Sequence, residues 1–227
     1  MANSVSETAV LYNQVHVIRS SVGDHAVVSD NVDLLDSEIA PYAEIGRRNL
    51  VINSFVGEGS YTGSNDVLSH ARIGRYCNIS WNVGLGGGNH NYRAACMFTD
   101  HYWGKILDID FGCEVAKGTS GGCEIGNAVW IAQAVSVVSG VTIGDGAVVG
   151  AGSTVLSDIP PFAVAVGTPA RVVKYRFDEE TIERLLGIAW WDWDREVIRA
   201  NAGLLRANVD GGVLEELERV SIGQWSN

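Results

Sequence analysis

Apolar residues recur every six positions along much of this chain. From Ile125 the sequence divides into consecutive hexads, IGNAVW, IAQAVS, VVSGVT, IGDGAV, VGAGST and VLSDIP. Each begins with Ile or Val, carries Val, Ala, Ser or Ile at its fifth position, and is rich in small and turn-forming residues in between. A helix repeats its apolar positions every three to four residues and an ordinary strand every two. The period of six therefore indicates neither.

A six-residue unit fits a short strand followed by a bend. Gly, Asn and Asp accept the positive φ angles that β-branched residues avoid. Three units close one triangular coil, and parallel strand pairing between coils places the first-position Ile or Val above its equivalent, pointing inward. The same unit recurs upstream with slips of phase, near Val22, Ile39, Val56 and Ile73. We therefore predict an all-β solenoid, interrupted by a long loop excursion over about residues 86–122.

The pattern changes after the Pro160–Pro161 pair, because proline cannot continue a hydrogen-bonded ladder. Helix-cap signals follow at three aspartates, the first two of which have hydrophobic-staple residues around them. They are Asp178, Asp194 and Asp210. We expect two parts, a β-helix domain over residues 1–176 and a small α-helical appendage over residues 177–227.

Composition narrows the choice of partners. The chain has 227 residues and a net charge of -11, which disfavours nucleic acid because a polyanion would be repelled. Its four cysteines show no CxxC pair or zinc-finger spacing. The start MANSVSETAV lacks the features of a signal peptide, and no apolar run is long enough to cross a bilayer. We expect a cytoplasmic protein with reduced thiols and no membrane or nucleic-acid partner.

The excursion opens with the stretch GGGNHNYRAACMFTDHYW, residues 86–103, which has no strand or helix period. His90 is either a catalytic group or an ordinary histidine in a loop. The aromatic residues further along either line an acceptor pocket or hold the long loop together by packing on one another. The residues alone leave both alternatives open.

Four segments together resemble the xenobiotic acetyltransferases, the hexapeptide-repeat family that includes the type B chloramphenicol and the streptogramin acetyltransferases. They are ARIGRYCNISWNVGLGGGNH, IGNAVWIAQAVSVVSGVTIGDGAVVGAGSTV, VGTPARVVKYRF and FDEETIERLLGIAWWDW, within about residues 50–205. The resemblance implies a left-handed parallel β-helix and a homotrimer with inter-subunit active sites. It also implies transfer of an acetyl group from acetyl-CoA to a hydroxyl, or an amine, of a small acceptor.

The family's catalytic histidine falls on His90 by this resemblance. A neutral imidazole, with a pKa near 6.5, can take the proton of an acceptor hydroxyl during attack on the thioester, so no acyl-enzyme is needed. Asn89 either orients His90 or forms a turn. We expect the acceptor to contact a set of polar and aromatic residues around His90: Asn89, Tyr92, Asp100, His101, Tyr102 and Trp103.

Acetyl-CoA is expected to bind along the hexads and the segment that follows them. The resemblance places Trp130 near the acetyl-CoA channel and small residues along pantetheine. Arg171 and Lys174 are cations in a stretch without acids, suited to the phosphates of CoA. The expected cofactor-binding residues are Trp130, Ala132, Ala151, Gly167, Thr168, Pro169, Arg171 and Lys174.

Two alternatives belong to other classes of protein. A zinc enzyme like the γ-type carbonic anhydrases would need three histidines, and His70, His90 and His101 lack that family's close HxxxxH pair. A non-enzymatic solenoid would need regular outward threonine ladders, and the outward positions here are mixed. We therefore expect an enzyme without a metal. The segment FTDHYW departs from the TFPF-like pattern of the family, so the choice between an antibiotic and a saccharide acceptor stays open.

Overall fold

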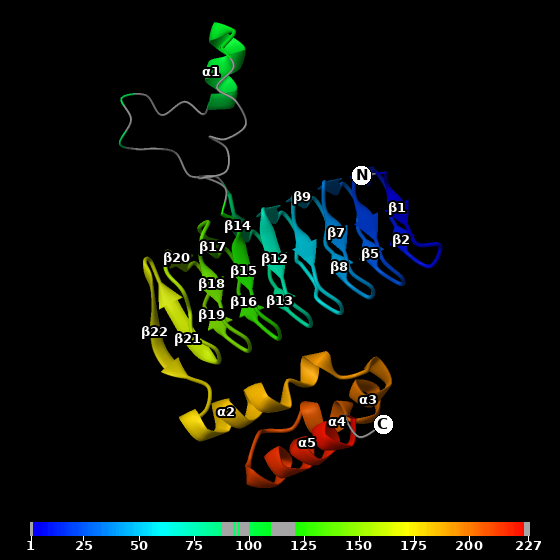
Figure 1. Cartoon of the computed structure of the whole chain (residues 1–227), viewed down its shortest axis with the longest axis vertical. Helices are drawn as coiled ribbons and strands as arrows, with labels where there is room; N and C mark the ends of the chain where they lie inside the picture. The colour runs from blue at the N-terminus through cyan, green and yellow to red at the C-terminus, as the bar shows by residue number, and fades with distance from the viewer. Residues whose placement is uncertain (1, 88–92, 94, 96–99, 110–120, 225–227) are drawn as a thin grey trace. The chain divides into compact units, whose positions relative to one another are not determined.

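The computed structural model describes residues 2–87, 93, 95, 100–109 and 121–224 (Figure 1), with only the backbone described for 100–103 and 224. The chain divides into two compact units, residues 1–173 and 174–227. The first is a parallel β-solenoid of about eight turns within the described residues. This confirms the solenoid predicted from the hexads.

Each full coil of the solenoid contributes a short strand or an isolated bridge to each of three faces. The first face contains β1 (Ser4–Val5), β4 (Ser21–Val22), β7 (Glu38–Ile39), β10 (Phe55–Val56), β12 (Ala71–Ile73), β15 (Cys123–Ile125) and β18 (Thr142–Ile143). The second contains β2 (Val10–Leu11), β5 (Val27–Val28), β8 (Glu44–Ile45), β13 (Asn78–Ile79), β16 (Trp130–Ile131), β19 (Val148–Val149), β21 (Ala163–Gly167) and β22 (Ala170–Tyr175). Bridges through Tyr61 join β8 to β13. The third contains β3 (His16–Ile18), β6 (Asp33–Leu35), β9 (Leu50–Ile52), β11 (Val67–Ser69), β14 (Gly84–Gly86), β17 (Ser136–Val137) and β20 (Thr154–Val155).

The coils are not all of one length, which explains the slips of phase in the sequence. On the first face Ser4 pairs with Ser21, Ser21 with Glu38 and Glu38 with Phe55, so each coil takes 17 residues. Glu124 then pairs with Thr142, 18 residues later. A 17-residue coil contains two hexads and one shortened unit, whereas an 18-residue coil contains three full hexads.

The solenoid interior is filled by the residues that the hexad pattern points inward. First-position residues such as Ile131 and Ile143 and fifth-position residues such as Val129 and Val135 are completely buried. The interior also holds Cys77, which is 1% exposed. Because equivalent strands pair in register, like residues stack from coil to coil and the core is continuous along the solenoid.

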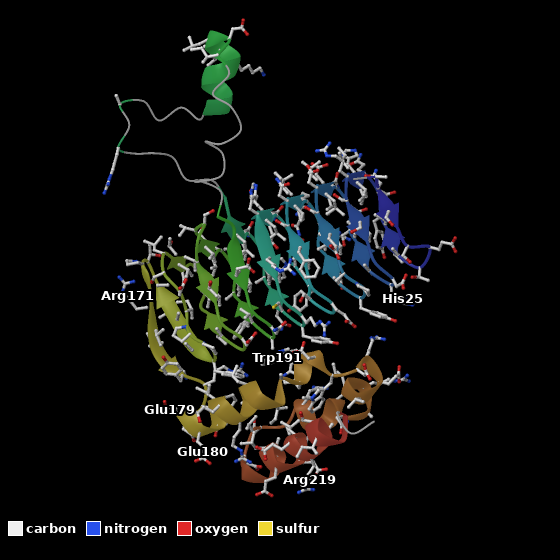
Figure 2. The ribbon with its side chains drawn as sticks, in the orientation of Figure 1. His25, Arg171, Glu179, Glu180, Trp191 and Arg219 are labelled. Carbon is white, nitrogen blue, oxygen red and sulfur yellow. The ribbon has the colours of Figure 1, made fainter. Side chains whose placement is uncertain are left out.

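The three corners are formed by residues with positive φ. At the first corner, between the first and second faces, the set is His25, Tyr42, Gly59, Tyr76, Ala128, Gly146 and Phe162. At the second corner, between the second and third faces, it is Gln14, Asn31, Arg48, Asn65, Asn82, Ala134 and Gly152. At the third corner, between the third and first faces, it is Arg19, Asp36, Asn53, His70, Gly87 and Gly140. Figure 2 shows His25, whose ring stacks on Tyr42 with centroids 4.9 Å apart.

The third corner is the short one in the 17-residue coils. In these coils the residue with positive φ is followed directly by a buried serine, and the turn is one residue shorter than in a full hexad. The Oγ of Ser20 accepts the backbone N–H of Ser37 at 2.9 Å, and the Oγ of Ser37 accepts that of Ser54 at 3.1 Å. This ladder satisfies buried backbone groups that a shortened turn would otherwise leave without partners.

The solenoid continues past the Pro160–Pro161 pair, because β21 follows and pairs with β19, with Ala163 and Ala165 buried. One detail of the solenoid differs from the sequence-based expectation. The excursion between β14 and β15 contains a helix, α1 (Asp100–Leu107). Eight residues make only two turns, which is too short for a helix period to stand out in the sequence.

The second unit is helical, and the three aspartate caps each precede a helix. It contains α2 (Glu179–Ile188), a 3-10 turn (Trp190–Asp192), α3 (Arg195–Ala200), α4 (Ala202–Leu205) and α5 (Gly211–Gln224). The Asp178 carboxylate accepts the N–H of Thr181 at 2.8 Å. Arg184 on α2 forms two hydrogen bonds with Glu218 on α5, at 2.7 and 2.8 Å. No described helix combines the length and apolarity needed to cross a membrane.

Candidate active site

Both ends of the excursion are fixed to the third corner of the solenoid. The N–H of Gly87 donates to the carbonyl of Ser69 at 3.1 Å, and the carbonyl of Gly122 accepts the N–H of Gly140 at 2.9 Å. A Cβ on Gly86 would lie 2.0 Å from the Ser69 oxygen, and one on Gly122 would lie 1.5 Å from the His70 oxygen. Glycine is therefore required at both positions, because the backbone of the previous coil occupies the space of any side chain.

The residues predicted for catalysis and acceptor binding belong to this excursion. His90, Asn89 and Tyr92 lie outside the described residues. Asp100, His101, Tyr102 and Trp103 form the first half of α1, where the backbone alone is described.

Most of the residues predicted for cofactor binding meet at the second corner of the last coils. The N–H of Gly167 donates to Ser153 Oγ at 3.0 Å, and Thr168 Oγ1 donates to the Gly152 carbonyl at 3.2 Å. Gly152 follows Ala151 directly in the chain. The N–H of Ala132 donates to the carbonyl of Val149 in the next coil at 2.9 Å. Ala132, Ala151 and the turn at Gly167–Pro169, whose Thr168–Pro169 peptide is cis, thus lie along one edge.

Trp130 lies on the outer side of β16, beside this edge. It pairs in register with Asn78 and Val148 and is 52% exposed. An indole exposed to this degree offers a broad apolar surface for a ligand or a partner chain.

Arg171 and Lys174 are both exposed on β22, as Figure 2 shows for Arg171. Side chains alternate between the two faces of a strand, and three positions separate this pair. The two cations therefore lie on opposite faces of β22 and provide two separate positive positions, not one patch.

The buried thiols have no nucleophilic character at neutral pH. Burial raises the pKa of Cys77 to about 11 and that of Cys123 to about 12. Since the thiolate is the reactive form, both residues are inert. Cys96 and Cys113 lie outside the described residues. In the described part of the chain, His, Cys, Asp and Glu side chains form no group of three that could hold a metal ion.

A groove of about 520 Å³ on the first face, beside the third corner, was not predicted from the sequence. Its lining includes Glu38, Phe55 and Arg72, which occupy the same outward position in three consecutive coils. A spacing of 17 links these residues. The spacing of 17 can be recognised only after the coil length is known. The hexad pattern changes its phase from coil to coil in this part of the chain, so it does not align the three residues.

Comparison with known proteins adds sequence matches to this geometry. The family model "Bacterial transferase hexapeptide (six repeats)" matches residues 122–157. A probable macrolide acetyltransferase of Lysinibacillus sphaericus is 36% identical over 155 residues, which are 64% of this chain and 80% of that relative. A chloramphenicol acetyltransferase of Klebsiella aerogenes is 35% identical over 136 residues, which are 59% of this chain and 64% of that relative. The match thus spans less than two thirds of the chloramphenicol acetyltransferase.

Among solved structures, the chain matches an N-acyltransferase from Bacillus cereus in complex with dTDP and 3-hydroxybutyryl-CoA. The match has a TM-score of 0.46 and 22% identity, and it covers 79% of this chain and 82% of the other.

Proposed function

The chain belongs to the xenobiotic acetyltransferase family of hexapeptide-repeat proteins, and from this premise we propose that it transfers an acetyl group from acetyl-CoA to a small-molecule acceptor. The accepting group is a hydroxyl or an amine, on an antibiotic or a saccharide. Family membership favours this function over the zinc enzyme and over the non-enzymatic solenoid.

The observation in this chain that best supports the proposal is the geometry at the base of the excursion. Gly87 is hydrogen-bonded to Ser69, and His90 follows three residues later. Three residues of backbone reach at most about 11 Å. The NH motif thus begins within covalent reach of the third corner, and we propose that His90 serves an acceptor bound there.

The proposed step needs one general base and no covalent intermediate on the enzyme. The neutral imidazole of His90 takes the proton from the acceptor hydroxyl as the oxygen attacks the carbonyl carbon of the thioester. A C–O bond forms, the C–S bond breaks, and His90 returns the proton to the departing sulfur of CoA. The inert state of Cys77 and Cys123 supports direct transfer over an acyl-thiol intermediate at either residue.

The second-corner edge is proposed to bind acetyl-CoA. Ala132 and Ala151 leave room for the pantetheine chain against the coils, and Trp130 offers an apolar surface next to them. The turn at Gly167–Pro169 would lie toward the adenine end. Arg171 and Lys174 would each neutralise part of the phosphate charge from a different side of β22.

We propose that the active enzyme is a homotrimer whose sites lie between subunits. The excursion leaves from the third corner, whereas the proposed acetyl-CoA edge is at the second, with the third face between them. Exposed aromatic side chains also project from the coils, with Trp130 52% and Trp81 56% exposed. A neighbouring subunit would bury such surfaces and bring its own excursion to the acetyl-CoA edge.

An acceptor screen tests the proposed function. The wild-type protein is incubated with acetyl-CoA and a panel of antibiotics, hydroxy sugars and amino sugars, and release of the CoA thiol is measured. We expect acceptor-dependent release with at least one class, together with saturable acetyl-CoA binding by calorimetry. A protein that neither binds acetyl-CoA nor releases CoA with any acceptor would overturn the proposal.

A further inference from the structure

A groove of about 520 Å³ runs along the first face of the solenoid beside the third corner, outside the residues predicted from the sequence. The corner residues form one wall and the outward residues of the first face form the other. The lining includes Arg19, Asp36, Glu38, Phe55, Arg72 and Glu124. We call this feature the third-corner groove.

The groove has an aromatic ring at its centre, flanked by opposite charges. Phe55 pairs in register with Arg72 on one side and with Glu38 on the other. Neighbouring strands lie about 4.8 Å apart, so each charged side chain starts within reach of the ring. The Arg72 guanidinium lies over the ring, 4.7 Å from its centroid. The strand on one side of Phe55 thus supplies a cation over the ring, and the strand on the other side supplies Glu38.

The charges of the groove do not balance. Arg19 and Asp36 neutralise each other through two hydrogen bonds of 2.6 Å. The remaining charges in the groove are one cation, Arg72, and two carboxylates, Glu38 and Glu124. Among the described residues, no side-chain hydrogen bond or ion pair engages the Glu38 carboxylate. The groove therefore has an excess of negative charge, and its unpaired carboxylate belongs to the residue that pairs in register with Phe55.

We propose that the third-corner groove binds a protonated amine of the acceptor, held between the Glu38 carboxylate and the side of Phe55 opposite Arg72. Aromatic faces attract cations, and a carboxylate beside the ring strengthens that attraction. Asn53 and His70 on the corner wall offer polar groups for the hydroxyls of the same molecule. The acceptor class is thus a hydroxylated amine, such as an amino sugar or a compound that carries one.

The location of the groove links it to the proposed reaction. His70 lines the groove, and its backbone carbonyl is the group that Gly122 approaches at the base of the excursion. A molecule anchored at Glu38 thus extends toward the corner from which the excursion leaves. This inference rests on the proposed function for the identity of the ligand, and the binding test below is independent of catalysis.

Binding to the wild-type protein without acetyl-CoA is measured by ligand-observed NMR with four probes. Glucosamine and erythromycin carry amines, whereas glucose and chloramphenicol are neutral. We expect saturable binding of the amines, weakened about tenfold by Glu38→Gln and by Phe55→Leu. Glu38→Gln changes charge without changing shape, so it stays informative even if Phe55→Leu is poorly folded.

The second face supplies a matched control pair. Glu44 and Tyr61 also pair as outward neighbours in consecutive coils, but they lie outside the groove. Glu44→Gln and Tyr61→Leu should keep the wild-type affinity for both amines. Equal losses in the two pairs of variants, or no preference for amines in the wild type, would overturn the proposal. A change of oligomeric state in Glu38→Gln would also overturn it and identify the groove as a contact between copies.

Turnover separates this proposal from the proposed function. With an amine-bearing acceptor found in the screen, Glu38→Gln should raise the acceptor KM about tenfold and remove the preference over a neutral acceptor. Transfer that occurs with an unchanged preference would overturn the groove proposal and leave the acetyltransferase intact. Amine binding in the groove without any transfer would support the groove and count against the acetyltransferase.

Discussion

The carboxylate of Asp66 accepts the backbone N–H of Val83 through Oδ1 at 2.7 Å, across one coil of the solenoid. Asp66 is completely buried, and within the described part of the chain its Oδ2 has no hydrogen-bond partner. Burial raises the pKa of Asp66 to about 7, against the backbone hydrogen bonds that lower it. Val83 immediately precedes β14, the strand that leads to the excursion, so the hydrogen bond of Asp66 supports the coil next to the candidate site.

This environment predicts that stability falls as the pH rises. The folded protein holds the Asp66 proton up to about pH 7, whereas the unfolded chain releases it near the ordinary value of 3.8. Between these values the folded state binds more protons, so this residue's contribution is complete below about pH 4 and is lost toward pH 7. The slope for one such group is about 1.4 kcal/mol per pH unit.

Urea unfolding of the wild type and Asp66→Asn at several pH values from 5 to 8 measures this effect. The variant should lose the slope, so the difference in unfolding free energy between the two proteins should change with pH. Glu180→Gln, at an exposed acid on α2, serves as the control and should follow the wild type. Parallel curves for wild type and Asp66→Asn would contradict the prediction.

The glycines at the base of the excursion should tolerate no side chain. Gly122→Ala places a Cβ 1.5 Å from the His70 oxygen, and Gly86→Ala places one 2.0 Å from the Ser69 oxygen at a φ of +73°. Each should cost about 1–3 kcal/mol of unfolding free energy and lower acetyl transfer, because the backbone must move.

Gly121→Ala is the matched control, since nothing lies within 4 Å of a Cβ there. Its unfolding free energy and turnover should stay close to the wild type. If Gly122→Ala behaves like Gly121→Ala, the excursion is not held at the corner in the way described.

The opposite faces of Arg171 and Lys174 predict independent effects on acetyl-CoA affinity. Each change to alanine should cost about 1 kcal/mol, or roughly fivefold in the dissociation constant. Because the two side chains share no face of β22, the losses in the double variant should add, giving about 25-fold. Calorimetric titration measures all three variants, with Arg206→Ala on the helical unit as the control. The prediction fails if the double variant binds acetyl-CoA as tightly as the more affected single variant, because both cations would then hold the same phosphate.

The hexad period was enough to predict the solenoid. The apolar residue that begins each hexad points into the interior in coils of 17 and of 18 residues alike. It was not enough to predict the outer surface. The third corner is shortened in the coils of Ser20, Ser37 and Ser54, and their ladder of hydrogen bonds appears only in three dimensions. The alignment of Glu38, Phe55 and Arg72 along the groove depends on that shortening, so the sequence pattern gave no sign of it.

Parts of the candidate site could be predicted where a short sequence motif follows from the local backbone geometry. The glycines of GGGNH were recognisable, and the close approach of Gly86 to Ser69 now gives part of the reason for them. The small residues Ala132 and Ala151 were expected beside the pantetheine chain, and this role stays a prediction; the structure brings both to the second-corner edge. Arg171 and Lys174 were expected to serve the phosphates of CoA, and this stays a prediction; the strand that carries them, with its alternating faces, now assigns them to different sides of β22.

The most direct test of the central claim is acetyl transfer by His90→Ala, with the best acceptor from the screen and saturating acetyl-CoA. Removing the general base should lower kcat about 10²- to 10⁴-fold and leave acetyl-CoA affinity near the wild type. His16→Ala, at an exposed histidine bonded to Asp33 in the first coils, should keep full activity. Wild-type turnover by His90→Ala would contradict the account.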